Sequence, residues 1–181
     1  MRHSHHVPQS LLALVVLLFG MTTAQAQTAA PAPTLTHVFS LRAELAAPVE
    51  LGEIDGKRKR FIEVTSGKVF GPKLSGKVLG GGGDWQAIAP GGLTEVWARY
   101  SIQADDGTVI GVVNTGVRTA TAEVSDKLAR GIEVDPGQYY FRTTTTFEVK
   151  AGPHEWLRRK VFVARGIRKP DHVLIDFYVV R

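Results

Sequence analysis

The residues best suited to chemistry follow a run of four glycines, in the segment GGGGDWQ at residues 80–86. Glycine lets a backbone turn sharply and approach a ligand closely, and Asp84, Trp85 and Gln86 follow at once. A carboxylate can move a proton if burial raises its pKa, while aromatic and amide groups can hold a small molecule beside it. We interpret the segment as the lip of a pocket, with a flexible hairpin loop as the alternative.

Further polar and aromatic residues with chemical potential are spread along the chain after this segment. They are Arg99, Asn114, Arg118, Tyr140, Arg142, Trp156 and Asp176. A guanidinium beside a carboxylate and aromatic rings would suit a small aromatic or enolisable ligand that bears an anion. Each arginine has an alternative role, which is a structural ion pair with Asp84 or Asp176, or simple exposure to solvent.

The elements that must position these residues are almost all strands, because apolar and polar residues alternate through most of the chain. Strands are expected at residues 36–45, 61–65, 68–79 with a bend or bulge at 71–72, 85–89, 93–104, 108–117, 139–149, 156–163 and 172–180. One helix is expected at 122–130, because Thr121 can cap it and Gly131 can end it. These elements predict an all-β fold, a single closed antiparallel β-barrel of about 8–10 strands with one short helix.

The beginning of the chain is typical of an exported protein. Arg2 precedes the apolar run LLALVVLLFGM at 11–21, and Ala24-Gln25-Ala26 fits a cleavage site, so residues 1–26 are predicted to be a signal peptide. Residues 27–34 are then a flexible tether and residues 35–181 the barrel domain. We expect a periplasmic or secreted protein with no integral membrane span after cleavage.

Composition and motifs argue against several other classes of protein. The 181 residues carry a formal charge of +5 and no cysteine, which excludes disulfides and thiolate sites. The glycine run lacks the Gly-Lys-Ser/Thr of a phosphate-binding loop, and the histidines after residue 26 show no metal-ligand spacing. The basic run KRKR at 57–60 is expected to be a solvated hairpin tip. We therefore expect no cofactor, no metal and no nucleic-acid partner.

Several segments together resemble the family named domain of unknown function 3237, over about residues 37–180. The segments are VTSGKVFGPKLSGKVL (64–79), GGGGDWQ (80–86), ARYSIQADDG (98–107), NTGVR (114–118), YYFRT (139–143) and HEWLRRKVFV (154–163). The resemblance implies one barrel of calycin-like shape with an internal cavity, and it implies little about activity. It favours Arg142 facing inward with Tyr140 on the same face.

Three functions from different classes follow as hypotheses. The first is an exported barrel that binds a small, possibly aromatic or anionic molecule in a polar, aromatic-lined cavity. The second is an isomerase, cyclase or lyase without a cofactor, with Asp84 as acid or base, Arg142 stabilising negative charge and Tyr140 beside it. The third is a structural envelope protein whose cavity is filled by its own side chains. The sequence alone leaves open whether the protein is an enzyme, and what its oligomeric state is.

Overall fold

The computed structural model describes residues 30–181, so the predicted signal peptide and the first three residues of the predicted tether lie outside the described residues. Within these residues, no helix combines the length and the apolar character needed to cross a bilayer. Residues 33–181 form one compact unit, and it contains all the strands described below.

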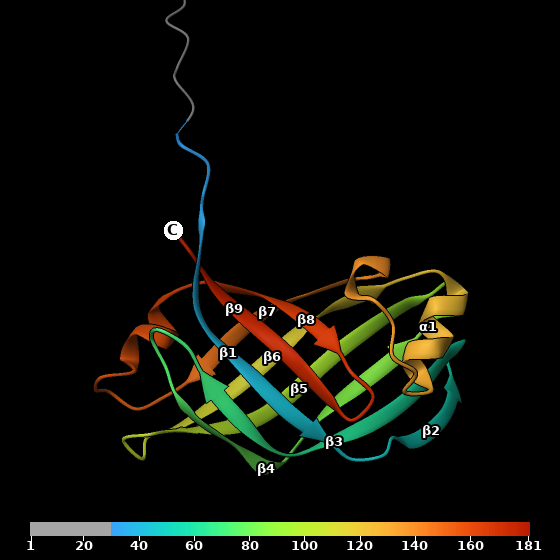
Figure 1. Ribbon diagram of the computed structural model, residues 1–181, viewed down its shortest axis with the longest axis horizontal. Coiled ribbons are helices and arrows are strands. Elements are labelled where there is room, and N and C mark those ends of the chain that lie inside the picture. The colour runs from blue at the N-terminus through green and yellow to red at the C-terminus, as the bar shows by residue number, and fades with distance from the viewer. Residues whose placement is uncertain (1–29) are drawn as a thin grey trace, which may run out of the picture. The chain divides into compact units, whose positions relative to one another are not determined.

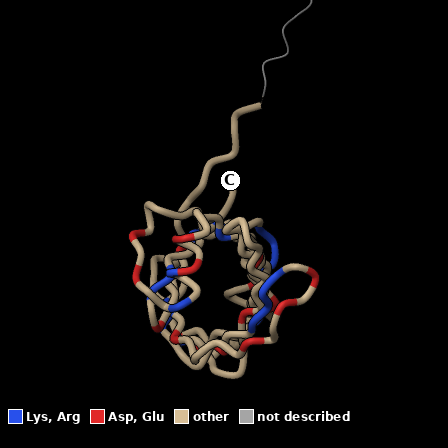
Figure 2. Tube along the Cα trace, turned by 90° about the vertical axis from the view of Figure 1, so that its right-hand side faces the viewer, with Lys and Arg blue, Asp and Glu red and all other residues tan. Residues whose placement is uncertain are grey.

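This unit is a closed antiparallel barrel of eight strands (Figures 1 and 2). Its described elements are β1 Leu35–Leu45, β2 Val49–Ile54, β3 Lys57–Phe70, β4 Gly76–Ile88, β5 Leu93–Ala104, β6 Val109–Thr119, α1 Ala122–Ala129, η1 Pro136–Gln138, β7 Tyr140–Glu148, η2 Glu155–Arg159, β8 Phe162–Arg168 and β9 His172–Val180. The hydrogen-bonded order is β1-β9-β8-β7-β6-β5-β4-β3, and pairing of β1 with β3 closes the ring. The ninth strand, β2, extends the sheet beside β3. The predicted all-β barrel with one short helix is therefore confirmed.

Alternation along each strand sends one set of side chains into the barrel and the other set outward. On β7, for example, Phe141, Thr143, Thr145 and Phe147 are buried while the residues between them are exposed. One part of the interior is a dense apolar core, in which Phe39 stacks on Phe177 with ring centroids 4.6 Å apart. The polar inward residues collect in another part of the interior.

The glycine run lies inside β4 rather than in a loop, which corrects the expected pocket lip. Leu79 pairs with Ser101 but Gly83 pairs with Arg99, so two extra residues are accommodated in a bulge. A Cβ at Gly82 would lie 2.5 Å from the Tyr100 Cα atom, and one at Gly83 would lie 2.0 Å from the Phe61 ring. The glycines therefore allow β4 to pack closely against its neighbours while Asp84 turns inward.

The helix predicted at 122–130 is present as α1, and it covers one end of the barrel (Figure 1). The Thr121 hydroxyl accepts a hydrogen bond from the Val124 amide and caps the first turn. The inner face of α1 packs through Val124 and Leu128 against a second apolar cluster that includes Phe141. The helix thus shields the polar part of the interior from solvent.

Two expected strands were misplaced. Residues 71–75 form the turn between β3 and β4, so the expected bend inside one strand at 68–79 is wrong. Residues 155–159 form the short 3-10 helix η2 before β8 begins at Phe162. Gly71 and Pro72 interrupt the backbone pairing in the first segment.

Candidate functional site

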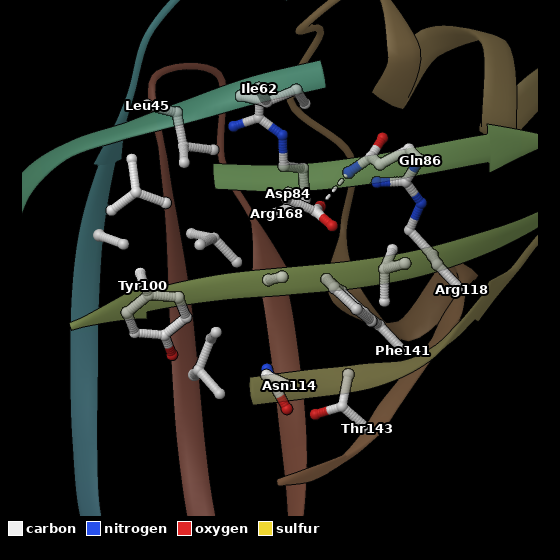
Figure 3. Close-up of a pocket in the computed structure, with 16 residues that line it drawn as sticks. Leu45, Ile62, Asp84, Gln86, Tyr100, Asn114, Arg118, Phe141, Thr143 and Arg168 are labelled. Atoms are coloured by element: carbon white, nitrogen blue, oxygen red, sulfur yellow. Dashed lines mark hydrogen bonds between the residues drawn. The ribbon is translucent and has the colours of Figure 1, made fainter. Parts of the chain in front are cut away.

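A small cavity lies inside the barrel among the polar inward residues (Figure 3). Its volume is about 40 Å³, which is large enough to hold water. Its polar lining consists of Asp84, Gln86, Tyr100, Asn114, Arg118, Thr143 and Arg168. The remaining wall is apolar and includes Ile62, Val96, Ala98, Phe141 and Ile175. An apolar wall with a few convergent polar groups is typical of a small-molecule site.

Asp84 is held from one side by a chain of buried side chains. The Gln86 amide Nε2 donates to Asp84 Oδ2 at 2.5 Å, and Gln86 Oε1 accepts from Arg60 Nε at 3.0 Å and Arg60 Nη2 at 2.8 Å. Arg60 Nη1 donates in turn to the Ala129 carbonyl at the end of α1, at 2.8 Å. The carboxylate is thereby fixed in orientation, with its second oxygen left for the cavity.

The buried charges in this region do not balance. Three arginines, Arg60, Arg118 and Arg168, are at most 7% exposed, whereas Asp84 is the single acidic residue in the described lining of the cavity. Burial, followed by the neighbouring cations, lowers the pKa of Arg60 and of Arg118 to about 10. Unpaired buried charge is costly, so this excess of positive charge favours an anion in the cavity.

Burial also acts on the carboxylate. It raises the pKa of Asp84 to about 6, against the opposing effects of the Gln86 hydrogen bond and of Arg118 and Arg60. A carboxyl group with a pKa near neutrality can both accept and return a proton under ordinary conditions. This property distinguishes Asp84 from a permanently ionised partner in a salt bridge.

Five buried polar atoms around this cavity have no hydrogen-bond partner within the described part of the chain. They are Asp84 Oδ1, Tyr100 OH, Arg118 Nη1, Thr143 Oγ1 and Arg168 Nε. Buried polar atoms in folded proteins almost always have a partner, and here five without one line the same small space. The pattern is that of a site prepared for a polar ligand or for water molecules.

The structure brings together four of the ten residues predicted from the sequence. Asp84, Gln86, Asn114 and Arg118 all line the cavity. Arg118 is positioned by a 3.4 Å hydrogen bond to Thr94 and by the Phe141 ring, whose centroid lies 6.0 Å from the guanidinium carbon. The Asn114 amide oxygen accepts from Thr145 at 2.7 Å.

The expectation that Arg142 and Tyr140 share the interior with Asp84 is wrong. Both lie on the outer face of β7, where the Arg142 guanidinium sits 5.0 Å from the centroid of the Tyr140 ring. The reason is that Phe141 and Phe147 are more apolar than their neighbours, so burying them turns Tyr140 and Arg142 outward.

The other four predicted residues also lie outside the cavity. Trp85 is on the outer face of β4 against Trp97, and Arg99 pairs with Glu148 at 3.0 Å on the outer face of β5. Asp176 accepts from the Ser40 hydroxyl at 2.7 Å, and Trp156 on η2 packs against Phe162. Each of these residues has a structural partner of its own.

Four residues in or beside the cavity are not among the ten predicted site residues: Arg60, Tyr100, Thr143 and Arg168. A signal for Tyr100 was present, because it shares its face of β5 with Val96 and Ile102, the apolar and therefore inward face. Arg60 likewise shares its face of β3 with the buried residues Ile62 and Val64. The basic run at 57–60 was expected to be a solvated hairpin tip. Its first three residues do lie at the surface, where they form ion pairs: Lys57 with Glu95, Arg58 with Glu50 and Lys59 with Asp55. Arg60, however, is buried.

One group of potential metal ligands occurs within residues 30–181, outside the cavity. It consists of Glu44, Asp171 and His172, whose ligand atoms lie within 4.8 Å of one another. Glu44 is already paired with Arg42 at 2.6 Å, and His172 Nδ1 lies 2.6 Å from Asp171 Oδ1. We assign no metal to these residues.

Comparison with known proteins supports the fold and leaves the chemistry open. Residues 33–180 match the model of a family described as "Protein of unknown function (DUF3237)". A UPF0311 protein of Clostridium acetobutylicum is 40% identical over 145 residues, which cover 80% of this chain and 92% of the relative.

Two solved structures show the same barrel. A conserved protein of unknown function from Rhodopseudomonas palustris is 36% identical, with a TM-score of 0.79 over 84% of this chain and all of the other. A β-barrel-like protein from Acinetobacter baumannii is 34% identical, with a TM-score of 0.74 over 86% of this chain and all of the other.

Proposed function

The chain belongs to the DUF3237 family of proteins of unknown function, and we propose that its barrel binds a small molecule carrying a negatively charged oxygen group in the cavity beside Asp84. The observation that carries the proposal is the set of five buried, unpartnered polar atoms around one cavity. A cavity closed by its own side chains would instead be expected to be apolar or internally satisfied.

The charges of the cavity indicate which part of the ligand binds where. Arg118 Nη1 and Arg168 Nε are unpartnered cationic donors, and a guanidinium recognises carboxylate oxygens especially well. The apolar wall around Ile62, Val96 and Ala98 suits a short hydrocarbon part. The cavity's volume of about 40 Å³ favours the smallest carboxylic acids.

Titration calorimetry with acetate tests this function. The wild-type protein is expected to bind acetate, and Arg118→Met is expected to weaken the binding roughly 10- to 100-fold, because a hydrogen bond to a charged group contributes about 1.5–3 kcal/mol. Arg142→Met is the matched control, since Arg142 lies on the outer face of β7. It should bind acetate as the wild type does.

Two results would contradict the proposal. One is a wild-type protein, folded by circular dichroism, that takes up no acetate. The other is an equal loss of affinity in Arg118→Met and Arg142→Met, which would place the anion on the protein surface.

We also propose that the barrel acts outside the cytoplasm. The support is in the sequence, in the apolar run at 11–21 followed by Ala24-Gln25-Ala26. Intact mass spectrometry of the protein collected outside the cytoplasm is expected to give a chain that starts at Gln27. A protein that retains Met1 and stays in the cytoplasm would overturn this part of the proposal.

A further inference from the structure

We propose that the cavity binds its carboxylate ligand together with one proton, which is held between Asp84 Oδ1 and an oxygen of the ligand. This inference rests on the proposed function, because it concerns the same anion held by the same arginines. It adds the chemical form of the bound state: two carboxyl groups, one from the protein and one from the ligand, that share a single negative charge.

An ionised carboxylate cannot satisfy all the unpartnered atoms of the cavity. Arg118 Nη1 and Arg168 Nε can only donate, so oxygens of the ligand can accept from them. Asp84 Oδ1, in contrast, can only accept while the carboxyl group is ionised. A ligand carboxylate has no hydrogen to offer, so two acceptors would face each other. One added proton turns this repulsive contact into a hydrogen bond between the two carboxyl groups.

In a space this small, an anion on Arg118 lies within reach of Asp84. The cavity has a volume of about 40 Å³, and Asp84, Gln86 and Arg118 lie close together at one end of it (Figure 3). Their charges are also linked. Besides burial, which dominates both shifts, the charge of Arg118 acts on the pKa of Asp84, and the charge of Asp84 acts on the pKa of Arg168.

Gln86 determines which oxygen of Asp84 can carry the proton. Gln86 Nε2 donates to Asp84 Oδ2 at 2.5 Å. Arg60 donates two hydrogen bonds to the Gln86 oxygen, so the amide keeps its donor side toward Asp84. Oδ2 is therefore occupied by a donor, and Oδ1, which has no partner in residues 30–181, is the oxygen that meets the ligand.

The ionisable groups that interact electrostatically with Asp84 come from four strands. They are Arg60 on β3, Tyr100 on β5, Arg118 on β6 and Arg168 on β8. The strands β1, β7 and β9 add only uncharged side chains to the described lining. The three arginines favour an ionised Asp84, so the uptake of a proton has to overcome them.

Burial already outweighs these arginines. It raises the pKa of Asp84 to about 6, although the Gln86 hydrogen bond, Arg118, Arg60 and the Trp97 backbone lower it. A ligand carboxylate displaces water from Asp84 and adds a like charge beside it, and both effects raise the pKa further. At neutral pH we therefore expect Asp84 to be mostly ionised in the free protein and protonated in the complex.

Calorimetry with acetate in Tris and in triethanolamine tests the inference, because the two buffers release different heats when they give up a proton. For the wild type at pH 7, the difference in binding heat is expected to correspond to nearly one proton taken up per acetate. The affinity is expected to fall by up to about tenfold per pH unit between pH 6.5 and pH 8, because the complex keeps the proton that the free protein loses above pH 6.

Asp84→Asn imitates the protonated carboxyl group. The asparagine oxygen can accept from Gln86 Nε2, which leaves the asparagine amide to donate to the ligand. This variant is expected to bind acetate without proton uptake and with equal affinity at pH 6.5 and pH 8. At pH 8 it should bind roughly tenfold more tightly than the wild type. Asp126→Asn, the same change at an exposed residue of α1, should keep the pH dependence of the wild type.

The two proposals fail in different ways. Wild-type protein that binds acetate without proton uptake, and equally well at pH 6.5 and pH 8, would overturn the shared proton and leave the binding function standing. Proton uptake that persists in Asp84→Asn would overturn it too, because another group would then take the proton. Protein that binds no acetate would overturn the binding function and, with it, this inference. The wild-type measurement decides the matter even if Asp84→Asn does not fold.

Discussion

Replacing Gln86 with leucine is expected to lower the free energy of unfolding by roughly 3 kcal/mol or more, because two hydrogen bonds to a charged group are lost. Gln86 is 6% exposed, and its amide oxygen accepts two hydrogen bonds from the buried Arg60 guanidinium. Leucine fills a similar volume but cannot accept a hydrogen bond, so Arg60 would stay buried, lose two hydrogen bonds and keep the one to the Ala129 carbonyl. Urea unfolding at neutral pH measures the change.

The same substitution should also alter Asp84. The Gln86 amide hydrogen bond lowers the pKa of Asp84, so its removal is expected to raise that pKa further. Gln103→Leu is the matched control, because Gln103 donates one 3.2 Å hydrogen bond to Gly107 in an exposed position. It should cost no more than about 1 kcal/mol. If the two variants lost similar amounts of unfolding free energy, the hydrogen bonds from Arg60 to Gln86 would contribute little to stability.

The stability contributed by Asp84 is expected to fall as the pH rises from 4 to 7.5. Its pKa is about 6 in the folded barrel, compared with a reference value of 3.8, so the folded state binds the proton more tightly than the unfolded state. The contribution is therefore fully present below about pH 4 and is lost as the pH rises through 6. Its size is roughly 3 kcal/mol.

A comparison with Asp84→Asn isolates this contribution from that of other titrating groups. Unfolding free energies of both proteins are measured at pH 4 and pH 7.5, and the advantage of the wild type over the variant should shrink by roughly 3 kcal/mol between the two. Parallel pH profiles would mean that Asp84 has an ordinary pKa in the folded state. In that case Asp84 would not be suited to accept and return a proton near neutral pH.

Much of the fold could be predicted from local pattern, because period-two alternation and turn residues determine strands wherever one face is buried. The strand at 93–104 is predicted in this way, and the helix at 122–130 is predicted from its Thr121 cap and from Gly131 at its end. Four of the ten predicted site residues, Asp84 among them, also lie in the cavity. Asp84 was singled out by the glycine run, although those glycines form a bulge rather than a loop.

Alternation shows which residues share a face of a strand, but it does not always show which face is inside. On β7, threonines stand at both inward and outward positions, and two phenylalanines decide the outcome by turning Arg142 out of the barrel. The strand carries this information at its ends, where Phe141 and Phe147 lie. The central threonines fit either face equally well.

The charged surroundings of Asp84 were decided only by the tertiary structure. Arg60 meets the carbonyl of Ala129, which is 69 residues away along the chain, and Arg168 reaches the same cavity from β8. Nothing in the local sequence of these segments encodes that meeting, since it depends on the register of eight strands and on the closure of β1 against β3. The sequence by itself thus determined a barrel with a carboxylate turned inward. Closure of the ring placed three buried arginines around this carboxylate, because contacts between distant strands exist only once the sheet is complete.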